Sequence, residues 1–121
     1  MGLSFTVKEM SELTGFSVST LHYYEHQGLL KAVARNASGH RCYSEGDLEW
    51  LEFVKRLRAT GMPLTQIRKM GDLRRRGPDT LAKRIEMVEA HERSICARIA
   101  DLEDNLREIQ AKLVHLREIG T

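Results

Sequence analysis

The sequence predicts a mainly α-helical fold, and three features of its 121 residues support this prediction. Two short amphipathic segments stand on either side of a tight turn that contains a glycine, and a polar stretch with the pattern of a β-hairpin follows them. The C-terminal third then repeats apolar residues at steps of three and four. We therefore expect a winged helix-turn-helix domain over residues 1–76 and a long C-terminal coiled-coil dimerisation helix over residues 77–121.

The first helix is predicted to begin after Thr6, because Thr6 and Glu9 have the spacing of a capping box. Gly15 is placed to end this helix, since glycine tolerates the left-handed backbone conformation that closes many helices. The predicted apolar face consists of Val7, Met10 and Leu13.

Residues 17–30 predict a second helix, which we interpret as the reading helix of the helix-turn-helix unit. Ser17 is a suitable N-cap, Val18 and Leu21 begin an apolar stripe, and Gly28 ends the segment. When this segment is considered alone, an ordinary core helix is the alternative interpretation. Four of its side chains combine a flat ring with a hydrogen-bonding group, which suits contact with phosphates and base edges: His22, Tyr23, Tyr24 and His26.

A wing is predicted after this helix, because Asn36–Gly39 has the composition of a turn between two short strands. A plain surface hairpin with solvated arginines is the alternative. The wing side chains suited to lie along a DNA backbone are Arg35, His40, Arg41 and Tyr43.

Two further helices follow in the predicted domain. Ser44 and Asp47 resemble a second capping box at the start of the third helix, and Gly61 ends it. Pro63 fits the first turn of the fourth helix. The expected buried faces are Leu48, Leu51, Phe53, Val54 and Leu57 in the third helix, with Trp50 near the edge, and Leu64, Ile67, Met70 and Leu73 in the fourth.

A heptad pattern begins at Asp79 and continues over about five repeats, which predicts a coiled coil. Such a helix is roughly 60 Å long and cannot bury its own apolar stripe. Because no other segment predicts a helix of similar length, a second copy of the chain is the simplest partner. Glu92 alone interrupts the seam, and we expect it near an end of the overlap or paired with Arg93, Arg84 or a partner residue. The seam consists of Leu81, Ile85, Val88, Ile95, Ile99, Leu102, Leu106, Ile109, Leu113 and Leu116.

The net charge of +2 is distributed unevenly along the chain. Residues 61–78 carry five basic side chains and one acidic side chain, and from Lys55 to Arg76 only Asp72 is acidic. Such a block attracts polyanions and makes binding dependent on salt concentration. A solvated helix face is the alternative interpretation.

Several classes of protein are excluded by what the sequence lacks. No apolar run is long enough to span a membrane and the N-terminus has no signal-peptide pattern, so we expect a cytoplasmic protein. Cys42 and Cys96 lie far apart in unlike contexts, which indicates neither a disulfide nor a metal site. No glycine-rich phosphate loop, acid–base pair or activated nucleophile is present, so we expect neither an enzyme nor a cofactor.

The chain resembles the MerR family of bacterial transcription regulators along nearly its whole length and in the family's order. The resemblance rests on Phe16–Leu21, Tyr23-Tyr24-Glu25, Gly28-Leu29-Leu30, Gly39–Ser44 with Asp47-Leu48, Leu57–Gly61 with Ile67, and the terminal heptads.

The resemblance implies a winged helix-turn-helix joined to an antiparallel two-stranded coiled coil that forms the homodimer. The dimer would bind an inverted repeat between promoter elements whose spacing is too long for RNA polymerase. Effector binding would then bend and undertwist the DNA, at a cost on the order of 1–6 kcal/mol for smooth bending. Such a protein represses and activates from one site.

The resemblance also assigns expected DNA contacts by position. His22 departs from the family pattern, because this position commonly holds arginine, which has a permanent charge and a donor fork that histidine lacks. The implied contacts are Tyr23, Tyr24 and Arg58 to phosphates, Arg41 and Tyr43 from the wing, and Ser19, Thr20 and His22 on the base side.

The effector is not disclosed by these residues. We expect neither a metal site at the start of the long helix nor an appended ligand domain. The pattern of Asp47–Lys55 is closest to an aldehyde- and electrophile-stress subgroup, but the third helix has Arg56 and no thiol, so that subgroup's cysteine mechanism cannot be transferred. Cys96, beside the seam, is interpreted as a small packing residue, with a thiol sensor as the alternative.

The favoured function is a homodimeric regulator that recognises double-stranded DNA and affects RNA polymerase indirectly at the promoter. The alternative is a coiled-coil interaction module whose winged domain has lost DNA binding.

Overall fold

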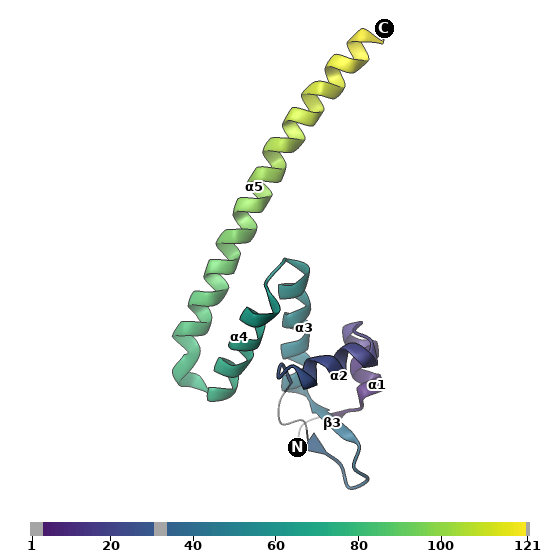
Figure 1. Ribbon diagram of the computed structural model, residues 1–121, viewed down its shortest axis with the longest axis vertical. Helices are drawn as coiled ribbons and strands as arrows, with labels where there is room; N and C mark the ends of the chain where they lie inside the picture. Colours follow the sequence, from purple (N-terminus) through teal and green to yellow (C-terminus); the bar gives the residue numbers. More distant parts are fainter. Residues whose placement is uncertain (1–3, 31–33, 121) are drawn as a thin grey trace. The chain divides into compact units, whose positions relative to one another are not determined.

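The computed structural model describes residues 4–30 and 34–120 of the chain, and within them it confirms the mainly α-helical prediction. Contacts divide the chain into two units, Met1–Arg84 and Ile85–Thr121, which are described separately. A boundary between residues 76 and 77, at the end of the fourth helix, stays a prediction. The elements are β1 (Ser4–Phe5), α1 (Val7–Thr14), α2 (Val18–His26), β2 (Ala34–Arg35), β3 (Arg41–Ser44), α3 (Glu45–Ala59), α4 (Leu64–Arg76), a 3-10 turn (Pro78–Thr80) and α5 (Leu81–Ile119) (Figure 1).

The helix-turn-helix forms as predicted from its capping residues. The Thr6 hydroxyl accepts a hydrogen bond from the Glu9 amide at 3.1 Å, and the Glu9 carboxylate accepts one from the Thr6 amide at 2.9 Å. Gly15 ends α1 with a φ of 82°, which the left-handed region allows without steric cost. The Ser17 hydroxyl then accepts a hydrogen bond from the Thr20 amide at 3.0 Å and begins α2.

The turn between α1 and α2 is fixed by side chains as well as by Gly15. Thr14 is fully buried; its hydroxyl donates to the Met10 carbonyl at 2.7 Å and accepts from the Phe16 amide at 3.2 Å. The Ser11 hydroxyl donates to the Phe16 carbonyl at 2.6 Å. These bonds satisfy backbone groups that the helix ends leave open, and they hold α2 in place on α1.

The predicted wing is present, and the sheet contains a strand that the sequence did not predict. The strand order is β1-β3-β2, with both pairs antiparallel. The unpredicted strand, β1, pairs Phe5 with Tyr43 and Ser4 with Ser44. A strand of two residues is too short to show the alternation of apolar and polar side chains that predicts a strand. It forms because β3, far along the chain, pairs with it.

The core lies between α1, α2, α3 and α4, and it corrects the prediction for Trp50. We expected Trp50 near the edge of the buried face, but it is only 5% exposed, and its indole N–H donates to the Leu29 carbonyl at 2.9 Å. Leu13, expected on the buried face of α1, is exposed. The buried apolar side chains are Met10, Leu21, Tyr24, Leu29, Leu30, Tyr43, Trp50, Leu51, Val54, Leu57, Met62, Ile67, Met70 and Leu73.

The C-terminal end of α4 is connected to the first turn of α5 through Thr80, which is buried. Its hydroxyl lies 2.6 Å from the Leu73 carbonyl and 2.8 Å from the Gly77 carbonyl, and it accepts a hydrogen bond from Arg84 at 3.1 Å. One hydroxyl therefore occupies carbonyls that the end of α4 would otherwise leave unpaired.

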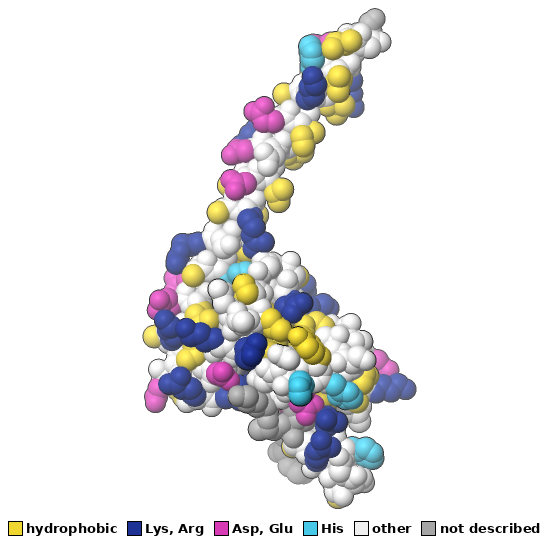
Figure 2. Space-filling model, in the orientation of Figure 1, with side chains coloured by type: hydrophobic (Ala, Val, Ile, Leu, Met, Phe, Trp, Pro, Cys, Tyr) yellow, Lys and Arg dark blue, Asp and Glu magenta, His cyan; other side chains and the backbone are white. Residues whose placement is uncertain are grey.

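The long helix α5 contains no buried residue. Figure 2 shows apolar side chains running along it, with acidic side chains on another side. Within the part of the chain that the structure describes, no helix has the length and apolarity needed to cross a membrane.

Candidate nucleic-acid interface

Helix α2 has one buried face and one exposed face. Leu21 is fully buried and Tyr24 is 4% exposed, and the Tyr24 ring packs edge-on against Phe16 with ring centroids 5.2 Å apart. On the other face, His22 is exposed and Tyr23 is 49% exposed. The buried face fixes the helix on the domain, so its polar, aromatic face is free to meet a ligand.

The C-terminal end of α2 is closed by Gly28, as the sequence predicted. Gly28 has a φ of 84°, and the Leu29 amide donates to the Tyr24 carbonyl at 2.9 Å across it. This is the Schellman arrangement, which requires a residue that tolerates positive φ. It turns the chain inward so that the Leu29 carbonyl meets the indole of Trp50.

The tip of the wing is closed by hydrogen bonds to Asn36. Its side-chain oxygen accepts from the Ser38 amide at 2.9 Å and from the His40 amide at 3.0 Å. The Arg35 guanidinium donates to the Gly39 carbonyl at 2.8 Å. The turn and one wing cation are therefore positioned by the chain itself.

An ion pair joins the wing to α2. The Nε of Arg41 lies 2.7 Å from a carboxylate oxygen of Glu25. This hydrogen bond and the charge of Glu25 raise the pKa of the Arg41 guanidinium above its ordinary value. Arginine is protonated at physiological pH in any case, so the pair is between two full charges. The resemblance included Glu25 in its matching residues, but the sequence assigned it no role, because residues 16 positions apart show no helical or hairpin spacing.

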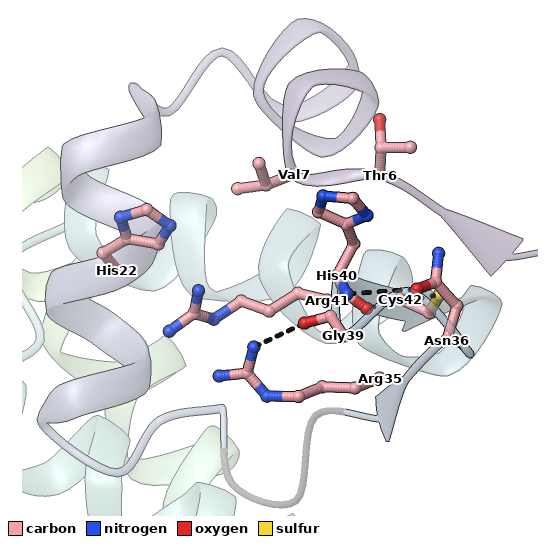
Figure 3. A pocket seen from close by; sticks show the side chains of 9 residues that line it. All are labelled: Thr6, Val7, His22, Arg35, Asn36, Gly39, His40, Arg41 and Cys42. Atoms are coloured by element: carbon pink, nitrogen blue, oxygen red, sulfur yellow. Dashed lines mark hydrogen bonds between the residues drawn. The ribbon is translucent and has the colours of Figure 1, made fainter.

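A groove of about 470 Å³ lies between α2 and the wing. Figure 3 shows the imidazole of His22 on one side and the guanidinium groups of Arg35 and Arg41 reaching across from the wing. Two permanent cations and two imidazoles around one concave surface form a site suited to a phosphate group. The lining residues are Thr6, Val7, His22, Arg35, Asn36, Gly39, His40, Arg41 and Cys42.

The predicted DNA contacts differ in their accessibility. Six of them reach the surface fully or in part, whereas Tyr24 and Tyr43 are buried at 4% and 0% exposure. The Tyr43 hydroxyl has no hydrogen-bond partner among the described residues. The accessible six are Ser19, Thr20, His22, Tyr23, Arg41 and Arg58, the last at the C-terminal end of α3.

We expect Tyr43→Phe to raise the free energy of unfolding by about 1 kcal/mol, because it removes a buried hydroxyl that lacks a partner. Burial, followed by the charge of Glu25, raises the pKa of Tyr43 above its ordinary value. The free energy of unfolding that depends on the protonated phenol is therefore complete below the unfolded pKa of about 10, and it is lost as the pH rises through the higher folded value. The free energy of unfolding of the wild type should therefore fall relative to that of the variant as the pH rises above about 10.

Urea unfolding of both proteins between pH 7 and pH 11 measures this effect, and DNA affinity at pH 7 is the control. Because the hydroxyl is buried, we expect operator affinity to be unchanged. A large loss of affinity with unchanged stability would instead support the DNA contact that the resemblance implies for Tyr43.

The basic block from Lys55 to Arg76 contributes less free charge than its composition suggests. Arg74 lies 5.5 Å from the centre of the Trp50 ring and donates to the Gly46 carbonyl at 2.9 Å. Arg75 pairs with Asp72. Arg74 therefore joins α4 to α3, whereas the pair of Arg75 with Asp72 lies within α4, and simple counting of charges reveals neither role.

Neither cysteine is engaged in a disulfide. Cys42 is partly buried in the groove and Cys96 is exposed on α5. Among residues 4–30 and 34–120, no three histidine, cysteine or acidic side chains lie together as a metal site would require. The packing and sensor interpretations of Cys96 both stay predictions.

Comparison with known proteins agrees with this geometry. A family model described as "MerR HTH family regulatory protein" matches residues 5–72, and a second, "MerR, DNA binding", matches residues 48–112. An uncharacterised HTH-type transcriptional regulator of Haemophilus influenzae is 32% identical over 111 residues, spanning 92% of this chain and 82% of its own. The nodulation protein NolA of a Bradyrhizobium species is 36% identical over 103 residues, but the match spans only 42% of that longer protein.

Solved structures show the same relationship. HiNmlR, described as a MerR family regulator lacking the sensor domain and bound to promoter DNA, superposes with a TM-score of 0.83 at 30% identity, covering 96% of this chain and 92% of its own. A MerR-type regulator from Listeria monocytogenes gives a TM-score of 0.82 at 31% identity, covering 90% and 83%. The chain therefore belongs to the MerR family of DNA-binding transcriptional regulators.

Proposed function

We propose that the chain acts as a homodimer that binds an inverted-repeat operator and activates or represses transcription by distorting promoter DNA. The observation that carries this proposal is the cationic groove beside the exposed face of α2, with Arg35, Arg41 and His22 around it. The solved relative bound to promoter DNA supports the same class of ligand. RNA polymerase would then be affected through the shape of the promoter.

In this proposal, one group of residues contacts the DNA backbone and another contacts the bases. Arg41 and Arg58 neutralise phosphates and set the position of the domain, because contacts to the backbone are independent of sequence. Ser19, Thr20 and His22 lie on α2, where they would face base edges in the major groove. Tyr23 supplies an exposed ring and hydroxyl beside them.

DNase footprinting on the promoter that precedes the protein's own gene tests the proposal. We expect protection of two half-sites related by two-fold symmetry, with salt-dependent affinity and clear preference over unrelated DNA. Dimerisation without sequence-preferring DNA binding would contradict it and favour the interaction-module alternative.

We predict that Arg41→Gln lowers affinity for operator and for unrelated DNA alike, by about tenfold, and reduces the slope of log affinity against log salt by about 1. The reason is that a phosphate contact carries no sequence information. Glu25→Gln should act differently: it removes a negative charge beside the groove and releases Arg41. Affinity for unrelated DNA should rise while the ratio of operator to unrelated affinity falls.

Fluorescence anisotropy at several salt concentrations measures both variants. Glu12→Gln, which removes an exposed carboxylate from α1, is the matched control. If Glu25→Gln reproduced the uniform loss of Arg41→Gln, the ion pair would serve only to keep the wing folded.

A further inference from the structure

Two imidazoles line the groove between α2 and the wing. His22 comes from the exposed face of α2, and His40 comes from the tip of the wing. Figure 3 shows both rings at the groove together with the guanidinium groups of Arg35 and Arg41. The groove therefore combines two kinds of basic side chain. Arginine keeps its charge throughout the physiological range, whereas histidine ordinarily changes its charge between about pH 5 and pH 8.

Both imidazoles are open to a ligand. The two residues are exposed, and among the residues that the structure describes neither ring has a hydrogen-bond or ion-pair partner. The backbone of His40 is nevertheless fixed, because its amide donates to the side-chain oxygen of Asn36 at 3.0 Å and its carbonyl accepts from the Asn36 amide at 2.8 Å. An ordered hairpin therefore presents a ring whose nitrogen atoms are unoccupied within the described structure.

The carboxylates on the elements that form the groove are engaged or lie outside its lining. Glu25 is bonded to Arg41, and Glu9 is bonded to the Thr6 amide. None of the lining residues that the structure describes is acidic, so the ligand itself would supply the negative charge that pairs with a protonated ring. Besides the two histidines, the ionisable side chains on these elements are Lys8, Glu9, Glu12, Tyr23, Tyr24, Glu25, His26, Arg35, Arg41, Cys42 and Tyr43.

We propose that the protein takes up protons at His22 and His40 when it binds DNA, so that its affinity for the operator rises as the pH falls from 8 to 5.5. This inference rests on the DNA binding of the proposed function and adds a regulation to it. A neutral imidazole has one donor and one acceptor, whereas a protonated imidazole has two donors and a positive charge. Phosphate oxygens and the N7 and O6 atoms of guanine are all acceptors, so contacts to the backbone and to guanine both favour the protonated ring.

The direction and size of the effect follow from linkage. Because bound protein would hold more protons than free protein, a higher proton concentration must strengthen binding. Each charge that neutralises a phosphate adds about 0.9 to the steepness of log affinity against log salt. Between pH 8 and pH 5.5 we therefore expect operator affinity to rise by at least about tenfold, and this salt slope to become steeper by about 1 to 2. The wing arginines keep their charge over this range and contribute none of the change.

Fluorescence anisotropy at several salt concentrations and at both pH values tests the proposal, with full-length protein and the DNA fragment that footprinting protects. His22→Gln and His40→Gln each remove a titrating ring but keep a side chain that forms hydrogen bonds. We expect each to remove about half of the change in log affinity, and the double variant to remove nearly all of it. His40→Gln should act equally on unrelated DNA, because contacts from the wing to the backbone are independent of sequence.

Two control variants remove other titrating groups. His115→Gln changes an exposed histidine on α5, and Cys42→Ser removes the thiol that lines the groove. Both should keep the wild-type dependence on pH. Loss of that dependence in either control would assign the effect to a group other than the two groove imidazoles and overturn the proposal.

Permanent charges at the two positions should reproduce the protonated state. We expect the double variant of His22→Arg and His40→Arg to bind unrelated DNA at pH 8 within about threefold of the affinity that the wild type has at pH 5.5, with little dependence on pH. A variant that failed to fold could not gain affinity in this way. Unchanged or weaker binding at pH 8 would contradict the proposal.

Calorimetry in two buffers of different ionisation enthalpy counts the protons directly. At pH 6.5 we expect the wild type to take up about one proton per subunit on binding the protected fragment, and the double glutamine variant to take up close to none. Binding without proton uptake, or a double variant that keeps the wild-type dependence on pH, overturns the proposal and leaves the regulator function intact. Absence of sequence-preferring binding at both pH values overturns the proposed function itself, so the two failures are distinguishable.

Discussion

Trp50→Ala is expected to lower the free energy of unfolding by about 3–5 kcal/mol, the cost of deleting a large buried aromatic side chain. Trp50 has three contacts that act together: it fills the core at 5% exposure, its N–H donates to the Leu29 carbonyl, and Arg74 stacks on its ring. Marginal domain stability makes a loss of this size a large part of the total. Urea unfolding followed by circular dichroism at one fixed protein concentration measures it.

Two further variants separate the contributions. Trp50→Phe keeps an aromatic ring but leaves the Leu29 carbonyl without its donor, so we expect an intermediate loss of about 1–3 kcal/mol. Phe53→Ala, on a neighbouring ring that is only half-buried, is the control and should cost less than Trp50→Ala. Equal losses for Trp50→Ala and Phe53→Ala would contradict a central role for the indole.

Leu106→Asp is expected to raise the dimer dissociation constant by roughly a thousandfold, because it places an unpaired carboxylate in each of two seam layers. Operator affinity should fall by about a hundredfold or more, since each subunit then binds its half-site without the effective concentration that a dimer supplies. Sedimentation and anisotropy on the operator measure the two effects.

Ala111→Asp is the matched control for this substitution. It adds the same charge and the same poor helix former to α5, but at a position that lies outside the heptad seam. It should leave both dissociation constants within about threefold of wild type. If the two substitutions weakened operator binding equally, the loss would come from the helix and not from the seam.

The parts of the fold that the sequence predicted are those set by residues close together in the chain. Thr6 with Glu9, and Ser44 with Asp47, each form a complete capping box, because both partners lie within one helical turn. The turn at Gly15 and the long helix α5 also follow from local spacing. Such features need no knowledge of the rest of the fold.

The parts that it missed depend on residues far apart in sequence. Trp50 looked peripheral on its own helix, and only the Leu29 carbonyl, 21 residues earlier, gives its N–H a place in the core. Arg41 was expected in the site, but its partner Glu25 was given no role. The strand β1 exists because β3 pairs with it. Each depends on tertiary packing that no short window of sequence contains.

The closed tip of the wing affects the thermodynamics of recognition. Because Asn36 already accepts hydrogen bonds from the Ser38 and His40 amides, the turn of the hairpin is ordered before any ligand binds. Ordering a flexible loop costs roughly 1–2 kcal/mol per residue in conformational entropy. In the proposed complex, a wing that has met this cost during folding would leave more of its contact energy available for affinity and for the distortion of promoter DNA.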